Sequence, residues 1–389
     1  MSFDHSEQIS DPIGGSYEVP PDVLSEIAAP ALAGAKISID ENTFLTVGAG
    51  LRASFSAVED GAPNGDDYST DFAVNNMRLY LGGQITDKIS FTFNTECDDC
   101  GSGGDMMVLD AIAQFAFTPA FNIWLGRMLT PADRIEMNGP FYGIAWNQYT
   151  VPLFPSDQGN NDAGKFGRDD GVTVWGNVGH FQYAVGVFDG YEGASNDGDN
   201  LLYAARFAYN FLNMEENPGY YTSGTYFGGL GDILTLGFSI QYQADGTGTA
   251  LDSADFTGYV VDLLWESVFS AGVLTIDGEY KVFDAALSDT ARLDPDCFCL
   301  FDGTSYLATA AWLFPAEIGM GKFQPYVRYT RNEPDGYADE SDLYELGVNY
   351  VIKGHNAKIN LNYTNGDANL TGTPGADADA ITLGVQLQI

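Results

Sequence analysis

Residues 381–389, ITLGVQLQI, end the chain and alternate between two kinds of side chain. The apolar residues share one parity and the polar residues the other: Ile381, Leu383, Val385, Leu387 and Ile389 against Thr382, Gly384, Gln386 and Gln388. Successive side chains of a β-strand point to opposite faces, so this stretch predicts a strand with one wholly apolar face. A soluble sheet can have the same pattern, and the fold therefore depends on which solvent that face meets.

The same alternation recurs from residue 43 onward, with gaps rich in Gly, Asp and Asn between the alternating stretches. It predicts about sixteen strands, near 43–55, 71–84, 88–96, 108–118, 121–129, 170–178, 180–189, 200–211, 231–243, 255–267, 271–283, 303–315, 321–332, 340–352, 356–364 and 380–389. Bacterial single-chain membrane barrels have an even number of strands, which this count satisfies.

The connections between these strands alternate in length, which predicts one short-turn rim and one long-loop rim. Short connections fall near 86–87, 119–120, 178–180, 268–270, 316–320 and 353–355, and long ones near 58–70, 97–107, 130–169, 190–199, 244–254, 284–302, 333–339 and 365–379. The connection 212–230 breaks the pattern, because it is long where a short turn is due. It could hold an extra strand pair or an inserted turn.

Composition separates a membrane barrel from the alternatives. The chain has 389 residues and a mean hydropathy of −0.10, and it contains no uninterrupted apolar run of the ~18 or more residues that a membrane helix needs. A barrel strand needs only about 9–11 residues with one apolar face. A soluble β-sandwich would give no reason for connections of alternating length. We therefore predict an all-β fold, a transmembrane antiparallel barrel whose closure leaves no unpaired edge in lipid.

The charge is strongly acidic, with 16 Lys+Arg against 54 Asp+Glu and a net charge of −38. Such a surface repels nucleic acids, which we exclude as partners. Much of the acid lies in the gaps between strands. It either solvates the loops or holds divalent cations and favours cation entry.

Residues 1–42 differ from the rest, and Pro12, Pro20, Pro21 and Pro30 punctuate this acidic stretch. We expect an irregular N-terminal extension there, with a short helix possible around 22–29, and the barrel over residues 43–389. The first ten residues lack the basic and apolar regions of a secretory signal. For an outer-membrane protein we expect that such a signal has been removed.

Four cysteines form two close pairs in gaps between strands, Cys97 with Cys100 and Cys297 with Cys299. The one-residue spacer of the second pair departs from the usual spacing of zinc ligands, so a metal is not assigned. Disulfides in an oxidising compartment fit better, either within each pair or between the two loops.

The longest gap, 130–169, contains Asp133, Arg134 and Glu136 before a stretch rich in proline and aromatic residues. Aromatic side chains of a long loop would be poorly placed in water, so we expect this segment to fold into the lumen and set its narrowest section. The alternative is an external lid with its own small core.

Arginines on the polar parity of four strands are candidates to line the lumen: Arg52, Arg78, Arg206 and Arg328. Acids can share that face: Glu96, Asp110, Asp262, Glu266, Asp277, Glu279 and Glu345. Rings of charge select ions in pores. Alternatively, the inward charges pair only to satisfy one another.

No catalytic arrangement stands out. His5, His180 and His355 lie in the tail and in two short turns, and no phosphate loop or nucleophile elbow occurs in a strand–helix context. We expect neither an enzyme nor a cofactor.

Within residues 43–170 the chain resembles the bacterial phosphate-selective porin O/P family. The likeness lies in the stretches NNMRLYLGG at 75–83, DKISF at 87–91, 110–117 and FNIWLGR at 121–127. The resemblance implies a sixteen-stranded, usually trimeric outer-membrane channel with pore-lining arginines, which map onto Arg52, Arg78 and Arg127. Phosphate selection needs a dense basic cluster, whereas this chain has only 16 Lys+Arg in all. We therefore expect the channel function of this family but not its selectivity for phosphate.

Together these features predict a porin of the bacterial outer membrane for passive diffusion of small hydrophilic solutes or ions, tolerant of cations. Its expected partners are outer-membrane lipid, lipopolysaccharide, two further copies of the chain and divalent cations at acidic loops. The alternative function is a barrel scaffold in a larger outer-membrane complex, either an electron conduit or a surface-layer attachment.

Overall fold

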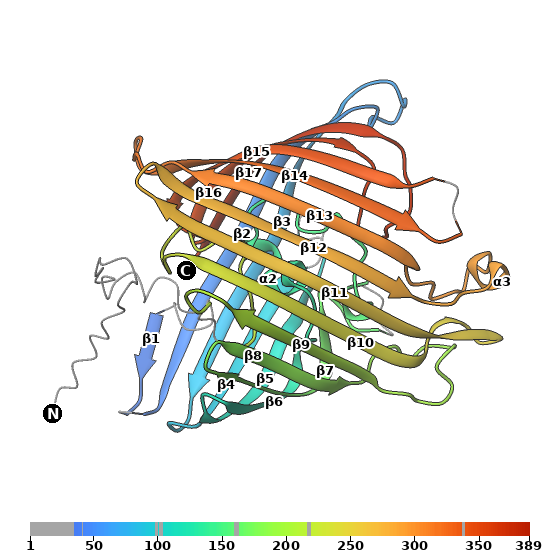
Figure 1. Ribbon diagram of the computed structural model, residues 1–389, viewed down its shortest axis with the longest axis horizontal. Helices are drawn as coiled ribbons and strands as arrows, with labels where there is room; N and C mark the ends of the chain where they lie inside the picture. The colour runs from blue at the N-terminus through green and yellow to red at the C-terminus, as the bar shows by residue number, and fades with distance from the viewer. Residues whose placement is uncertain are drawn as a thin grey trace.

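Sixteen strands pair in chain order and close into one antiparallel barrel, seen in a computed structural model that describes residues 35–40, 42–97, 100, 104–158, 163–215, 219–336 and 339–389 (Figure 1). They are β2 (Phe44–Val58), β3 (Ser69–Gln84), β4 (Ile89–Cys97), β5 (Met106–Thr118), β6 (Phe121–Leu129), β7 (Arg168–Val178), β8 (Phe181–Phe188), β9 (Leu202–Asn210), β10 (Ile233–Thr249), β11 (Asp252–Phe269), β12 (Gly272–Asp284), β13 (Gly303–Leu313), β14 (Lys322–Pro334), β15 (Ser341–Lys353), β16 (Ala357–Gly366) and β17 (Ala378–Gln388). β17 pairs with β2, from Gln388 opposite Gly50 to Ala380 opposite Val58. The predicted fold class is confirmed.

The alternation of each strand separates an apolar outer face from a polar inner one. In β17, Leu383 and Leu387 are about half exposed, whereas Gln386 is fully buried. In β2, Leu51 is exposed and Arg52 is buried. Large apolar side chains thus lie outside and polar ones inside, the reverse of a water-soluble protein, as expected where the outer solvent is lipid.

The connections on the two rims alternate in length as predicted, except between β10 and β11, and the open question about 212–230 is resolved. The connection near 244–254 was predicted to be long, but β10 and β11 continue to a turn at Ala250 and Leu251. A bulge between Gln243 and Thr247 carries the ladder past the Asp245–Gly246 turn signal. The connection 211–232 contains no strand among its described residues, so the barrel count stays at sixteen.

A short strand, β1 (Ala35–Ser38), lies where the sequence predicted an irregular extension. It pairs with β2 from Ala35 opposite Val47 to Ser38 opposite Phe44. β17 does not reach this far, since Ile389 exchanges backbone hydrogen bonds with Ala49 at 3.0 and 2.9 Å. β1 therefore covers an edge of β2 that β17 leaves open. Residues 1–34, with the possible helix at 22–29, lie outside the described residues.

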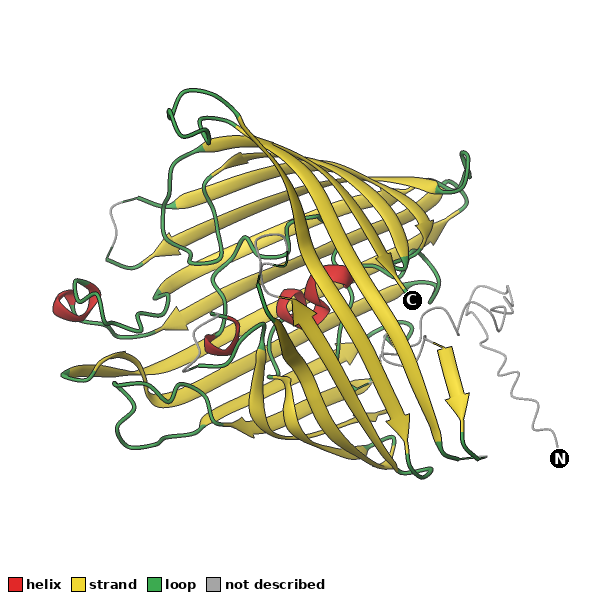
Figure 2. Ribbon diagram, turned by 180° about the vertical axis from the view of Figure 1, so that it is seen from behind, coloured by secondary structure: helices red, strands yellow, loops and turns green. Residues whose placement is uncertain are grey.

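Segments inside the barrel carry the other regular structure. Figure 2 shows the helix α2 (Arg134–Tyr142) within the ring of strands, whereas α3 (Asp289–Arg292) lies on the long-loop rim. The 3-10 helix η2 (Pro155–Asp157) is buried. In the described part of the chain, no helix has the length and apolar character to cross a membrane.

The long-loop end of the barrel has an apolar core of its own, which joins loops to wall. Tyr191 and Phe298 stack with ring centroids 4.1 Å apart, and Phe154, Phe256 and Phe283 are almost fully buried beside them. Each cysteine pair is joined within itself, Cys97 to Cys100 and Cys297 to Cys299. The second disulfide therefore encloses Phe298, one of the two stacked rings.

Candidate functional site in the barrel lumen

The connection between β6 and β7, described over 130–158 and 163–167, enters the lumen and places α2 at its centre. Asp133 caps the helix, because its side chain accepts a hydrogen bond from the backbone N–H of Glu136 at 3.0 Å. The helix is kinked at Gly139, whose φ of 62° is favourable only for glycine, and Pro140 follows. Residues 134–141 are all buried, so the helix contacts protein on every side.

Nine side chains of the barrel wall donate hydrogen bonds to backbone carbonyls of this connection. They come from eight strands: Arg206 to Ala132 (3.0 Å), Gln241 to Pro131 (3.0 Å), Lys281 to Pro152 (3.1 Å), Arg328 to Asn147 (2.5 Å), Asn332 to Thr150 (3.3 Å), Asn349 to Ile144 (2.9 Å), Lys358 to Gly143 (2.9 Å), Gln386 to Phe141 (2.9 Å) and Arg52 to Trp146 (2.6 Å). Irregular backbone leaves carbonyls unpaired, and buried carbonyls need partners. The polar parity of the strands supplies these partners and fixes the connection in place.

Most inward bases are paired with an inward acid. Arg78 contacts Glu96 at 2.5 Å and Arg168 contacts Asp110 at 3.1 Å. Two further pairs are also in contact, Arg206 of β9 with Asp262 of β11 and Arg328 of β14 with Glu345 of β15. These pairs satisfy buried charges and also cancel much of the field that unpaired arginines would create.

Lys281 faces three carboxylates. Its ammonium nitrogen lies 2.7 Å from Asp133, 3.3 Å from Glu136 and 3.5 Å from Glu279. Burial, and after it the neighbouring Asp133 carboxylate, raises the pKa of Glu136 well above its ordinary value. Lys281 is thus the one base in contact with these three acids at the start of α2.

A second inward segment meets α2 from the opposite rim. We call residues 211–215 and 219–232, between β9 and β10, the inner turn. Arg134 of α2 holds Glu215 through two hydrogen bonds of 2.7 and 2.8 Å, and lies 3.4 Å from Asp262 of the wall. Burial alone would raise the pKa of Glu215, but the Arg134 guanidinium outweighs it and lowers that pKa.

The inner turn was not predicted to enter the lumen. The signal was present, because Tyr220, Tyr221, Tyr226 and Phe227 would be poorly placed in a solvated turn. The same reasoning that placed 130–169 inside applies to this turn.

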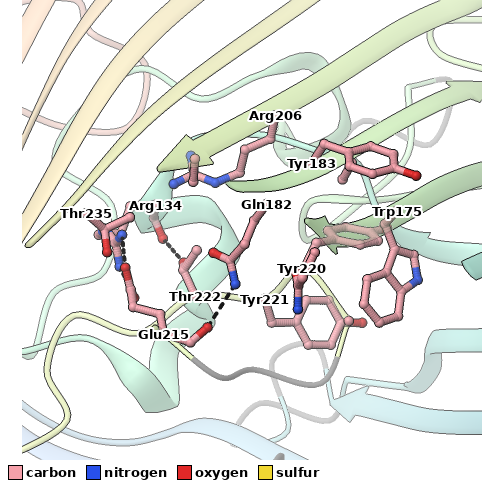
Figure 3. A pocket seen from close by; sticks show the side chains of 14 residues that line it. Arg134, Trp175, Gln182, Tyr183, Arg206, Glu215, Tyr220, Tyr221, Thr222 and Thr235 are labelled. Carbon is pink, nitrogen blue, oxygen red and sulfur yellow. Dashed lines mark hydrogen bonds and ion pairs between the residues drawn. The ribbon is translucent and has the colours of Figure 1, made fainter. Parts of the chain in front are cut away.

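An aromatic-walled pocket lies between the inner turn and strands β7 to β10 (Figure 3). It holds ≈ 430 Å³ of empty space, part of it open to solvent. Tyr220, Tyr221 and Trp175 line it, and the Arg134–Glu215 pair lies at its other end in Figure 3. Trp124 packs behind these rings, with centroids 5.4 Å from Trp175 and 5.2 Å from Tyr220.

Two inward bases have no carboxylate partner among the residues that the structure describes. Arg52 donates to the Asn76 side chain at 3.1 Å and lies over the Trp146 ring, 4.0 Å from its centroid. Lys358 donates to the Gly143 carbonyl at 2.9 Å. Both bases thus contact residues of the connection between β6 and β7 rather than acids.

The predicted site residues other than Arg127 fall into two places. The structure brings Arg52, Arg78, Arg206 and Arg328 to the inner wall, and Asp133, Arg134 and Glu136 to α2 at the centre. Their part in permeation stays a prediction.

Arg127 is a correction, because it lies on the outward parity of β6. Its neighbour Leu125 is 54% exposed, and Trp124 occupies the inward parity. Arg127 reaches Asp170 on the same outer face at 3.9 Å. Its assignment came from a resemblance in sequence letters, which does not fix the face of a strand.

Metal ligation has little support here. Across the described ranges, no three or more His, Cys, Asp or Glu side chains are grouped as metal ligands would be. The acidic loops therefore show no built cation site in the part of the chain that is described.

Comparisons with known proteins agree on the architecture. The family model for phosphate-selective porin O and P matches residues 45–389. Comparison with curated proteins found no match. Similar solved structures include the trimer form of OmpT from Vibrio cholerae (15% identity, TM-score 0.56, covering 90% of this chain and 100% of that one), Salmonella typhi OmpF (12%, 0.56, 91% and 100%) and Pseudomonas putida OprB (11%, 0.56, 90% and 95%). At these identities the structural likeness concerns the fold.

Proposed function

The chain belongs to the phosphate-selective porin O and P family, and from this premise we propose that its lumen passes small hydrophilic solutes with a preference for cations. It is a porin of the bacterial outer membrane, in which transport is passive diffusion through the barrel.

The charge of the interior carries the cation preference. Among the described residues, twelve acidic and eight basic side chains are buried, so the interior has four more acids than bases. Six of the eight bases contact an acid: Arg78, Arg134, Arg168, Arg206, Lys281 and Arg328. An anion entering the lumen would therefore find few unpaired cations, and the acidic rims would raise the local cation concentration outside it.

The family is described as phosphate-selective, but the lumen of this chain offers few free basic side chains that could bind phosphate. Arg52 and Lys358 are the inward bases without a described carboxylate partner, and both already donate to backbone carbonyls. We propose that phosphate has no privileged site, so adding phosphate would leave the potassium chloride conductance unblocked.

Planar-bilayer recording tests the proposal. Purified protein should give stepwise currents, and a potassium chloride gradient should give a reversal potential of the sign that cation preference requires. A reversal potential of the opposite sign would refute the cation preference. The absence of any conductance would refute diffusion through the lumen.

We also propose that three copies assemble, by analogy with the trimer form described for Vibrio cholerae OmpT. Chemical cross-linking of the protein in native membranes should then give bands up to the trimer and none larger. A monomer as the largest species would contradict this assembly.

A further inference from the structure

The connection between β9 and β10 is long on the rim where the other described connections are short. The neighbouring turn between β7 and β8 spans residues 179–180, and that between β11 and β12 spans 270–271. The inner turn is not needed to close a hairpin, because backbone hydrogen bonds already join Phe211 to Leu234 at 2.7 Å and Asn213 to Asp232 at 3.1 Å. The described residues between Asn213 and Asp232 therefore belong to an insertion that enters the lumen.

The inner turn and α2 are locked together by main-chain and side-chain contacts. Besides the two bonds between Arg134 and Glu215, the Thr222 hydroxyl contacts the Asn138 side chain at 2.7 Å and donates to the Arg134 carbonyl at 2.8 Å. The Gly224 N–H donates to the Tyr142 carbonyl at 3.0 Å. A bidentate arginine–carboxylate pair that is almost fully buried holds one geometry rather than many.

The wall holds the other side of the inner turn. Glu266 of β11 accepts from the backbone N–H groups of Tyr226 at 3.0 Å and Gly228 at 2.7 Å, and from the Thr225 hydroxyl at 2.7 Å. Across the lumen, the His355 imidazole contacts the Thr225 carbonyl at 2.9 Å. The inner turn thus contacts both β11 and the turn between β15 and β16.

We propose that the inner turn is a second constriction element, which limits solute size jointly with α2, and that the Arg134–Glu215 pair fixes its position. This inference rests on the proposed diffusion function. A solute that has passed α2 still meets a segment anchored at both ends, and the aromatic-walled pocket is the space left beside it. The inner turn and α2 then set the size limit for solutes together, rather than the connection between β6 and β7 alone.

The test is to remove the inserted residues and measure the pore. Replacing residues 214–231 by Asn-Gly, the preferred two-residue hairpin turn, keeps the bond between Asn213 and Asp232. Single-channel conductance should rise by about twofold or more, because it depends on the open cross-section, and larger poly(ethylene glycol) molecules should enter. The matched control shortens the mostly exposed loop 59–67 on the other rim, which should leave both readouts at the wild-type value.

A double variant, Glu215→Gln with Thr222→Val, covers the case in which the shortened barrel fails to fold. It keeps the length of the inner turn and weakens its contacts with α2, so we expect a smaller rise in conductance and added current noise. A folded shortened variant with wild-type conductance and polymer cut-off would overturn the inference while leaving the diffusion function intact. If the wild type showed no conductance and the shortened variant conducted, the inner turn would be confirmed as a constriction, and passive diffusion through the native lumen would be refuted. If neither the wild type nor the shortened variant conducted, both the constriction and the diffusion function would be refuted.

Discussion

Lys281 is the single base among three lumen acids, so its substitution should have a large effect on stability. Replacing it with methionine keeps the length of the side chain but leaves Asp133, Glu136 and Glu279 without their counter-ion. Removing one partner from a buried ion pair costs about 3–5 kcal/mol, so we expect Lys281→Met to lower the free energy of unfolding by that order. Urea titration of the protein folded into vesicles would measure it.

The control for this substitution is Lys88→Met, because Lys88 is exposed in the short turn between β3 and β4. It should change stability by far less. Equal effects of the two substitutions would mean that the Lys281 cluster is not a coupled unit.

Asp157, in η2, predicts a pH dependence of selectivity. Burial, against the opposing effects of Tyr149 and Arg168, raises the pKa of Asp157 to about 6. Since the folded-state pKa lies above the unfolded one, the folded protein binds the proton first, and this contribution to stability is lost as the pH rises through about 6. Below that pH the lumen carries one acid fewer.

We therefore expect the cation preference, measured as a reversal potential, to weaken as the pH falls from about 7 to about 5, on either side of the Asp157 pKa. The Asp157→Asn variant should show the weaker preference already at neutral pH and a flatter response over this interval. A wild-type response that the substitution leaves unchanged would assign the titration to another group.

At the scale of elements, the disulfide between Cys297 and Cys299 closes a small ring within the loop 285–302 around Phe298, the residue that joins this loop to its neighbours. The enclosed Phe298 stacks on Tyr191 and exchanges two backbone hydrogen bonds of 2.9 Å with Gly248. Replacing both cysteines by serine removes the constraint on Phe298, so we expect the loop to open more often. Trypsin cleavage after Arg292, in α3, should become faster.

The other disulfide, which joins Cys97 at the end of β4 to Cys100, provides the control. Replacing that pair by serine should not alter cleavage after Arg292. Equal acceleration in both variants would show that the effect is global unfolding rather than release of one loop.

The sequence predicted the strands well and the lumen less well, for a physical reason. Parity is a local property, so the alternation in 381–389 suffices to identify β17 and its faces. The inward course of the inner turn depends on partners far along the chain, such as Arg134 and Glu266, which no local pattern reveals. The prediction that Arg127 lines the pore was wrong because it rested on sequence resemblance alone. The alternation along β6 places Arg127 on the outer face, with Leu125.

At the scale of the whole molecule, the fold requires that the outer face meets hydrocarbon. Leu383 of β17 is 48% exposed and lies on that face, opposite Phe55 of β2. An arginine on the lipid face of a barrel near the bilayer midplane costs about 2–4 kcal/mol, falling to about 0–1 near the interfaces. We expect Leu383→Arg to destabilise the barrel in vesicles by the larger amount, and Thr70→Arg, close to the long-loop rim, by the smaller one. On the exposed surface of a water-soluble sheet the two substitutions would cost similar, small amounts, because arginine there stays hydrated. Equal and small losses in urea titration would therefore place this face in water, and the separation of outer from inner solvent on which diffusion through the lumen depends would be lost.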